Sequence, residues 1–266
     1  MYFATSFICI MSRLQQLFAT KQQRVLNVYC TAGYPQLDST LTVMTALQQN
    51  GADIIELGMP YSDPLADGSV IQESSAVALQ NGMTLATLFS QLADMRTHIH
   101  IPVILMGYMN PVLQYGFENF CAAAAAAGVD GLILPDLPEH EFETEYGSII
   151  KQYGLDFIFL VTPETSPQRV LHLDQLSSGF LYAVSSSATT GGNTNFDAVQ
   201  VYLQKLAALS LQNPVLVGFG VKDKATFEAV AQYANGAIIG SAYIKALQGS
   251  KQPAETTKIF LDSILQ

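Results

Sequence analysis

Short, apolar, β-rich runs alternate with helical stretches eight times along this chain of 266 residues. Most of these runs are continuously hydrophobic, which is typical of parallel strands that helices cover. Eight successive βα units predict an α/β fold whose strands close into a single (β/α)8 TIM barrel. The predicted strands span residues 25–31, 53–58, 103–108, 131–135, 157–162, 180–185, 215–218 and 237–239, and the predicted helices span 39–49, 85–96, 117–127, 141–153, 167–175, 196–209, 222–233 and 254–265.

An open, doubly wound sheet is the alternative for such an alternation. Its usual fingerprint, G-x-G-x-x-G after the first strand, is missing, because Thr31-Ala32-Gly33-Tyr34-Pro35 stands there. This favours the barrel without excluding the open sheet. One additional helix is expected at residues 69–79, since the connection after the second strand is too long for a plain loop.

The charge balance argues against two kinds of partner. The chain has 22 acidic and 12 basic residues, a net charge of −10, and no cluster of lysine and arginine offsets it. We therefore expect neither nucleic acid nor an anionic membrane to bind. An anionic small substrate would be held mainly by backbone N–H groups and helix dipoles.

Cysteine and histidine usage predicts neither a disulfide framework nor a metal site. Cys9, Cys30 and Cys121 are widely spaced and odd in number, as expected for a reduced, cytoplasmic protein. None of the four histidines is grouped with acidic residues at the spacing of metal ligands.

The second predicted strand runs into a carboxylate-rich loop. Glu56 lies near the end of the strand and Asp67 lies eleven residues later. If the loop folds back over the barrel mouth, both carboxylates flank one cavity, and different environments can make one an acid and the other a base. The alternative is structural: Glu56 is a buried acid paired with a backbone donor, and Asp67 caps a turn.

Glycines follow three late strands. Gly191 comes after the sixth, Gly220 after the seventh, and Gly240 with Ser241 after the eighth. Glycine lets the backbone approach an anion, and the helix starts that follow offer N–H groups, so together these loops predict a phosphate site. Each glycine alone is explained equally well by a tight turn. Lys222 adds positive charge to the site or is simply solvated.

Two further features surround the predicted mouth. Residues 185–195 are small, polar and nearly free of charge, which suits a mobile lid, although a plain flexible loop has the same composition. Tyr29, Met106 and Tyr182 supply apolar and aromatic groups from three strands, and core packing explains them as well as a binding wall does.

The segment from Glu56 to Gly68, ELGMPYSDPLADG, closely resembles the ELG-x-P-[FY]-SDP-x-ADG signature of the tryptophan synthase alpha subunit family. Thirteen matched residues with three carboxylates and two prolines are far more specific than a glycine motif. Further matches cover the chain from about Val25 to the C-terminus, at residues 29–35, 106–111, 134–138, 189–191, 218–221 and 240–242.

The resemblance implies an enzyme of tryptophan biosynthesis, part of a lyase complex, that cleaves indole-3-glycerol phosphate to indole and glyceraldehyde 3-phosphate. It implies that Glu56 is the acid at indole C3 and then the base at the side-chain hydroxyl. Asp67 would accept or stabilise the ring N–H proton. No cofactor is implied for this chain.

The resemblance also implies substrate contacts. Tyr29, Met106 and Tyr182 match positions that line the indole pocket. Thr190 would hydrogen-bond Asp67 when the lid closes. Some family members carry an arginine where this chain has Ser186, so a salt bridge that anchors the closed lid is in doubt.

A partner subunit is implied as well. The family works with a beta subunit that carries pyridoxal phosphate and receives indole through an internal channel, in an α2β2 tetramer. Nothing in this chain resembles a pyridoxal-phosphate lysine site, so the partner must supply the cofactor. The contact would involve Pro64, Asn110, Pro111, Asp136 and Pro138.

Two rival functions stay open on the residues. One is another phosphosugar-binding barrel, either an isomerase or an indole-glycerol-phosphate synthase; the latter needs a catalytic lysine at a strand end, and none is found. The other is an inactive barrel that only activates its partner. Intact Glu56, Asp67 and glycine loops weigh against the inactive barrel.

Residues 1–11 precede the segment that resembles the family. They are apolar but lack a positive n-region and a convincing cleavage site. We expect them to be a disordered extension or a misassigned start, with one catalytic barrel domain over residues 12–266.

Overall fold

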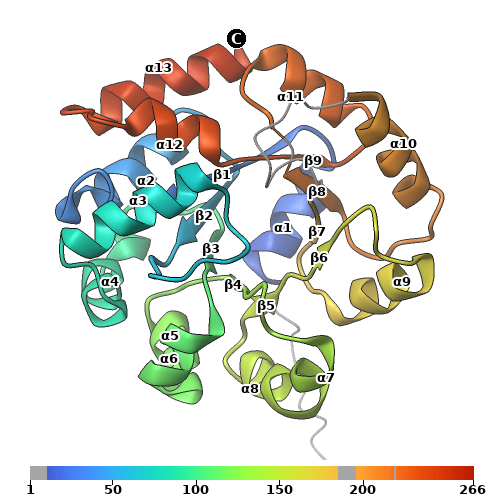
Figure 1. Ribbon diagram of the computed structural model, residues 1–266, viewed down its shortest axis with the longest axis horizontal. Helices are drawn as coiled ribbons and strands as arrows, with labels where there is room; N and C mark the ends of the chain where they lie inside the picture. Colours follow the sequence, from blue (N-terminus) through green and yellow to red (C-terminus); the bar gives the residue numbers. More distant parts are fainter. Residues whose placement is uncertain (1–10, 185–195, 219) are drawn as a thin grey trace, which may run out of the picture.

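A parallel sheet ringed by helices organises the chain, and the computed structural model describes residues 11–184, 196–218 and 220–266. The described strands run in the order β5-β4-β3-β2-β1-β9-β8-β7-β6, and every neighbouring pair is parallel (Figure 1). They are β1 Val25–Thr31, β2 Ile54–Gly58, β3 Val103–Met106, β4 Gly131–Ile133, β5 Asp156–Phe157, β6 Leu160–Val161, β7 Leu181–Val184, β8 Val215–Gly218 and β9 Gly236–Ile239.

The barrel closes through its fifth strand, which is split into β5 and β6. β5 pairs with β4, whereas β6 pairs with β7. Across the split, the Ile158 N–H donates to Leu132 O at 3.0 Å and the Tyr182 N–H donates to Phe159 O at 3.0 Å. One strand predicted at 157–162 therefore supplies both ends of the strand order. The (β/α)8 barrel is confirmed, and the open sheet is excluded because it would leave two free edges.

The helices other than α1 lie outside the strands (Figure 1). Each predicted helix is found, with shifted ends. The helix predicted at 141–153 contains a π-helical turn, η3, and those predicted at 39–49 and 85–96 include the short 3₁₀ turns η1 and η2. The bounds are α1 Arg13–Thr20, η1 Leu37–Ser39, α2 Thr40–Gln49, α3 Ser69–Gln80, α4 Leu85–Leu92, η2 Met95–Thr97, α5 Met109–Tyr115, α6 Phe117–Ala126, α7 Glu139–Glu141, η3 Phe142–Tyr146, α8 Gly147–Gln152, α9 Pro167–Leu176, α10 Phe196–Ala207, α11 Lys224–Ala231, α12 Ser241–Leu247 and α13 Pro253–Leu265.

Three of these helices, α1, α5 and α12, were not predicted. Each has eight residues or fewer, too few for a clear periodic pattern, and α5 and α12 are inserted directly after β3 and β9. α1 lies within the ring of strands in Figure 1, where Leu14 is fully buried against the inner core. α1 therefore plugs one end of the barrel.

Alternate residues of each strand face the barrel interior and the helices. At the α1 end the inward side chains form an apolar cluster, with the polar Asn27 of β1 beside it. The outer set, including Leu26, Val28 and Cys30 of β1, packs with the helices in the larger core. The inner apolar cluster is Leu14, Val25, Ile54, Ile104, Ile133, Ile158, Phe180, Leu216 and Ile238.

Within the described ranges, no helix combines the length and the apolar character needed to span a bilayer.

Candidate active site

A cavity of about 480 Å³ opens where the strands end, opposite α1. It is lined by residues from β1, β2, β3, β6, β7, β8 and β9, from the loops after β2, β4, β8 and β9, and from α3 and α12. Thr190 and Gly191, which the sequence also predicts for this site, lie outside the described residues, as does Ser186. The predicted site residues that the cavity brings together are Tyr29, Glu56, Asp67, Met106, Tyr182, Gly220, Gly240 and Ser241.

Glu56 lies at an inward position of β2 and is only 1% exposed. Its Oε2 accepts a hydrogen bond from Asn27 Nδ2 at 2.7 Å, so its partner is a side-chain amide and not the backbone donor of the structural alternative. Burial raises the pKa of Glu56 to about 8; the Asn27 hydrogen bond opposes this rise and the Asp67 charge adds to it. Near neutral pH the carboxyl therefore holds its proton and can act as an acid.

Asp67 reaches the same cavity from the loop after β2. The loop folds back because the Asp67 N–H donates to Pro64 O at 3.1 Å and the Ala66 N–H donates to the Tyr108 hydroxyl at 3.1 Å. Burial raises the pKa of Asp67 to about 6, and hydrogen bonding with Tyr108 lowers it. Near neutral pH Asp67 is thus mainly an anion, so the two carboxyls are separated into an acid and a base.

Two tyrosine side chains that line the cavity pack directly against glycines of the neighbouring strands. A Cβ on Gly58 would lie 2.0 Å from the Tyr29 hydroxyl, and a Cβ on Gly218 would lie 2.4 Å from Tyr182 Cε2. Burial and the nearby carboxylates raise the pKa of both phenols well above their usual value. The two phenols therefore stay neutral. Any side chain at Gly58 or Gly218 would overlap the tyrosine that packs there.

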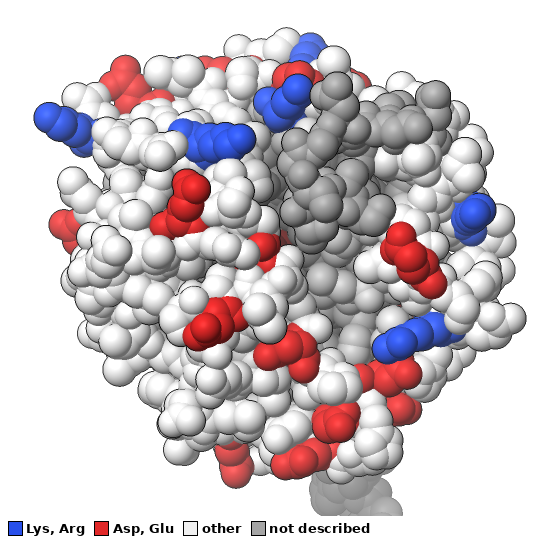
Figure 2. Space-filling model, viewed as in Figure 1, with Lys and Arg blue, Asp and Glu red and all other residues white. Residues whose placement is uncertain are grey.

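The late loops bring small residues and two cations to the rim. Gly220 has φ +41°, and Gly240 precedes Ser241 at the start of α12. Lys222 and Lys245 also line the cavity, and neither has a salt bridge within the described part of the chain. Figure 2 shows Asp and Glu side chains over much of this face, whereas Lys and Arg stand in a few separate places. An anion here would therefore meet backbone N–H groups and these two lysines.

Sequence reasoning missed three residues of the site: Asn27, Tyr108 and Lys245. Asn27 carried a signal, since it is a polar residue between apolar neighbours in the first strand, two positions before Tyr29. Tyr108 lies within a segment that matches the family, and Lys245 lies one helical turn beyond Ser241. Their contacts depend on neighbours far along the chain, so the sequence pattern alone did not identify them.

The loops after β2, β3 and β4 meet beside the cavity. Asn110 Nδ2 donates to the Tyr61 hydroxyl at 2.8 Å, and the Asp136 carboxylate accepts from the Met109 N–H at 3.0 Å and 3.1 Å. Of the residues predicted to contact a partner, Asn110, Asp136 and Pro138 are exposed, and Pro111 is partly exposed. Pro64 is buried, whereas its neighbour Leu65 is 94% exposed.

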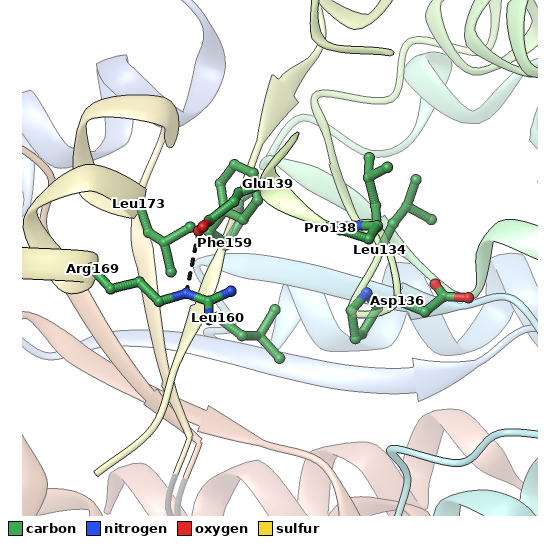
Figure 3. Close-up of a pocket in the computed structure, with 11 residues that line it drawn as sticks. Leu134, Asp136, Pro138, Glu139, Phe159, Leu160, Arg169 and Leu173 are labelled. Atoms are coloured by element: carbon green, nitrogen blue, oxygen red, sulfur yellow. Dashed lines mark ion pairs between the residues drawn. The ribbon is translucent and has the colours of Figure 1, made fainter. Parts of the chain in front are cut away.

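A smaller cavity of about 180 Å³ adjoins this rim (Figure 3). It shares Pro135 and Leu160 with the larger cavity. Arg169 Nε lies 3.2 Å from Glu139 Oε2 and joins α9 to α7 across the small cavity, with the Asp136 side chain directed away from the pair. This ion pair connects α7 with α9 beside the small cavity.

Nothing in the described ranges gathers three or more His, Cys, Asp or Glu side chains as a metal-binding group.

Known proteins match this chain over almost its whole length. The model of the family described as tryptophan synthase alpha chain matches residues 14–263. The tryptophan synthase alpha chain of Parabacteroides distasonis is 48% identical over 257 residues, which cover 96% of this chain and 100% of that protein. That of Bacteroides thetaiotaomicron is 44% identical over 255 residues, with coverage of 96% and 100%.

Solved structures are similar over the same length. The tryptophan synthase subunit alpha of Legionella pneumophila superimposes with a TM-score of 0.87 at 33% identity and covers 96% of this chain and 97% of that chain. A chain in the aminoacrylate-bound form of tryptophan synthase from M. tuberculosis gives a TM-score of 0.83 at 34% identity, with coverage of 96% and 100%.

Proposed function

The chain belongs to the tryptophan synthase alpha chain family, and we propose that its barrel cavity performs the lyase reaction of that family through Glu56 and Asp67. The reaction is the retro-aldol cleavage of indole-3-glycerol phosphate to indole and glyceraldehyde 3-phosphate. The observation that supports these roles most is the pair of carboxyls at one cavity, with pKa values of about 8 and about 6.

The cleavage needs proton moves that these two groups can balance. The Glu56 carboxyl donates its proton to indole C3 while Asp67 accepts the ring N–H proton. The Glu56 carboxylate then accepts the proton of the side-chain hydroxyl as the C–C bond breaks. The electrons of that bond return to the ring, and Asp67 returns the proton to nitrogen. Indole and an aldehyde leave, and both carboxyls regain their starting states.

The wall of the cavity suits the apolar half of this substrate. Tyr29, Met106 and Tyr182 would contact the indole ring, and the neutral phenols keep this wall free of charge. Holding the scissile bond between the two carboxyls supplies proximity, which lowers the barrier without a further catalytic group.

The glycine loops suit the phosphate half. Backbone groups of Gly220, Gly240 and Ser241 would approach the phosphate oxygens, with Lys222 and Lys245 adding positive charge from the rim. Thr190 and Gly191 keep their proposed roles in lid closure and phosphate binding, although both lie outside the described residues.

We assign pyridoxal phosphate to a partner beta subunit. The two lysines that line the cavity are exposed at its rim, so neither resembles the enclosed Schiff-base lysine that this cofactor requires. An α2β2 tetramer is proposed, with the contact at Asn110, Pro111, Asp136 and Pro138 and beside Pro64, where Leu65 is exposed. We also propose a cytoplasmic protein with one catalytic domain over residues 12–266.

The direct test is indole release from indole-3-glycerol phosphate, with and without a beta subunit. Slow release by the chain alone and faster release with the partner support the proposal, because docking on the loop between Glu56 and Asp67 would adjust the carboxyls. Absence of indole release in both conditions, from folded chain and a partner confirmed to bind, would contradict it.

A further inference from the structure

Asn27 is a polar residue in an apolar layer of the barrel. It faces inward on β1, and its Cα partners on the neighbouring strands are Ile54 and Ile238. Both belong to the inner apolar cluster. The next inward residue of β1 is Tyr29, which pairs with Glu56. Asn27 therefore lies one layer below the cavity, at a position that the rest of the layer fills with aliphatic side chains.

Fold stability does not explain this amide. Asn27 is fully buried, and its Oδ1 has no hydrogen-bond partner among the described residues. An unpaired buried carbonyl costs free energy, which an aliphatic residue of the same shape would avoid. The described contact that uses the amide is the 2.7 Å bond from Nδ2 to Glu56 Oε2. The position thus trades stability for a contact with Glu56.

We propose that Asn27 is a positioning residue for the proton transfers: its Nδ2 holds Glu56 Oε2 and leaves Oε1 to exchange protons with the substrate. Among the described residues, Glu56 Oε1 accepts no hydrogen bond, and Glu56 lines the cavity. A carboxyl on a flexible side chain gains directional proton transfer when one oxygen is fixed from behind. The inference rests on the proposed function, in which Glu56 is the acid and base.

The inference has a pH signature. Three ionisable groups face Glu56: Asp67 from the loop after β2, Tyr29 on β1 and Tyr182 on β7; the thiol of Cys30 lies on the outer side of β1, where the charge of Glu56 still affects it. Burial raises the pKa of the two phenols and the thiol, so these groups stay neutral. Asp67, with a pKa of about 6, sets the acid limb of the rate profile. Glu56 must start protonated, so its ionisation sets the alkaline limb, at about 8.

The test is Asn27→Leu in the complex with the beta subunit, assayed by indole release. Because the Asn27 hydrogen bond lowers the pKa of Glu56, its loss should move the alkaline limb to higher pH and leave the acid limb in place. We expect kcat to fall by about 10- to 100-fold with KM little changed. The matched control is Ile54→Val, a packing change in the same layer, which should alter neither kcat nor the limb.

Three results separate the alternatives. In a Glu56→Gln background, Asn27→Leu should cause no further loss, because both changes act through one carboxyl. Wild-type kcat and an unmoved alkaline limb in folded Asn27→Leu would overturn the inference. Wild-type turnover by Glu56→Gln itself would instead overturn the proposed function.

Asn27→Asp is the second variant if Asn27→Leu does not fold. It keeps the shape of the side chain and sets a second carboxyl against Glu56, so the alkaline limb should again move to higher pH. An unmoved limb in this variant counts against the inference equally.

Discussion

Two buried acids on the same barrel have different hydrogen-bond partners, arginines for one and a neutral amide for the other. Asp130, at the start of β4 on the α1 side, is 6% exposed and accepts hydrogen bonds from Arg13 Nη1 at 2.8 Å, from Arg96 Nη2 and from the Val103 N–H at 2.7 Å. Glu56, at the cavity, is 1% exposed, and its one donor among the described residues is the neutral amide of Asn27. The first carboxylate joins α1 to the barrel, whereas the second is left with a raised pKa.

The partners of a buried carboxyl group decide whether it stabilises the fold or can transfer a proton. A buried carboxylate that is paired with cations stays charged and holds elements together. A buried carboxyl without a cation keeps its proton and can deliver it. Ile54, in the apolar cluster, and Glu56, in the cavity, are only two positions apart along β2.

The largest effect is expected from Glu56→Gln. The amide keeps the shape and the contact with Asn27 but cannot transfer a proton, so turnover should fall at least roughly 10²-fold with KM little changed. Steady-state indole release measures this, with binding of a glycerol phosphate as the control for an intact cavity. Wild-type turnover would show that Glu56 is a structural acid like Asp130.

Asp130→Asn should have the opposite profile. It leaves Arg96 and Arg13 without their carboxylate, so we expect unfolding free energy to fall by roughly 2–3 kcal/mol, less than for a fully buried pair because both arginines keep solvent contact. Urea denaturation measures the loss. Indole release per folded molecule should stay unchanged. A large drop in kcat at unchanged stability would contradict a purely structural role for Asp130.

The pH dependence of the unfolding free energy tests the raised pKa of Glu56. The folded chain keeps the Glu56 proton up to about pH 8, whereas the unfolded chain loses it near about pH 4.3. Between these values the folded state binds more protons, so this carboxyl makes unfolding free energy fall as pH rises. Glu56→Gln should therefore gain stability relative to the wild type as the pH rises from about 5 to about 8, by roughly 4 kcal/mol at ~1.4 kcal/mol per pH unit. Parallel stability curves for the two proteins would refute the raised pKa.

At the phosphate end of the cavity, Gly240→Val should weaken binding of a glycerol phosphate by about 10-fold, because a side chain there occupies space that the anion needs. A Cβ at Gly240 meets its nearest atom at 3.5 Å, so the fold should tolerate the change. Calorimetric titration measures the affinity, and circular dichroism checks the fold. Unchanged affinity would mean that Gly240 only makes a turn.

The smallest effect is expected from Lys222→Gln, roughly a 2- to 5-fold loss of glycerol phosphate affinity that shrinks at high salt. Lys224→Gln is the matched control, since Lys224 lies two residues away and donates to Gln266 O instead of lining the cavity. Equal losses in both variants would point to a general charge effect and not to a contact at the rim.

Much of the fold was predictable because each barrel unit is locally encoded. Continuous apolar runs and turn residues located every strand, and β1 and β8 match their predicted bounds. The split of the fifth strand was not predictable, since it arises where one strand must pair with β4 and then with β7. α1 was missed because eight residues give too short a pattern, although Leu14, Leu17 and Phe18 lie at i, i+3 and i+4 and pack on the inner apolar cluster.

The candidate site divides in the same way. The density of the segment from Glu56 to Gly68 indicated both carboxyls and the family. Asn27 was missed because its role depends on strand register: the sequence shows a polar residue in an apolar run, but not which side chain it meets. The loop contact of Ala66 with Tyr108 joins segments 42 residues apart and was equally hidden.

Residue types and their local spacing set the repeated βα order, the carboxylates, the glycines and the excess of acidic over basic residues. Only the tertiary structure decided which buried acid meets arginines and which meets a neutral amide. Closure of the barrel sets the register between strands, and register decides whether a carboxyl is neutralised by a cation or kept protonated by burial.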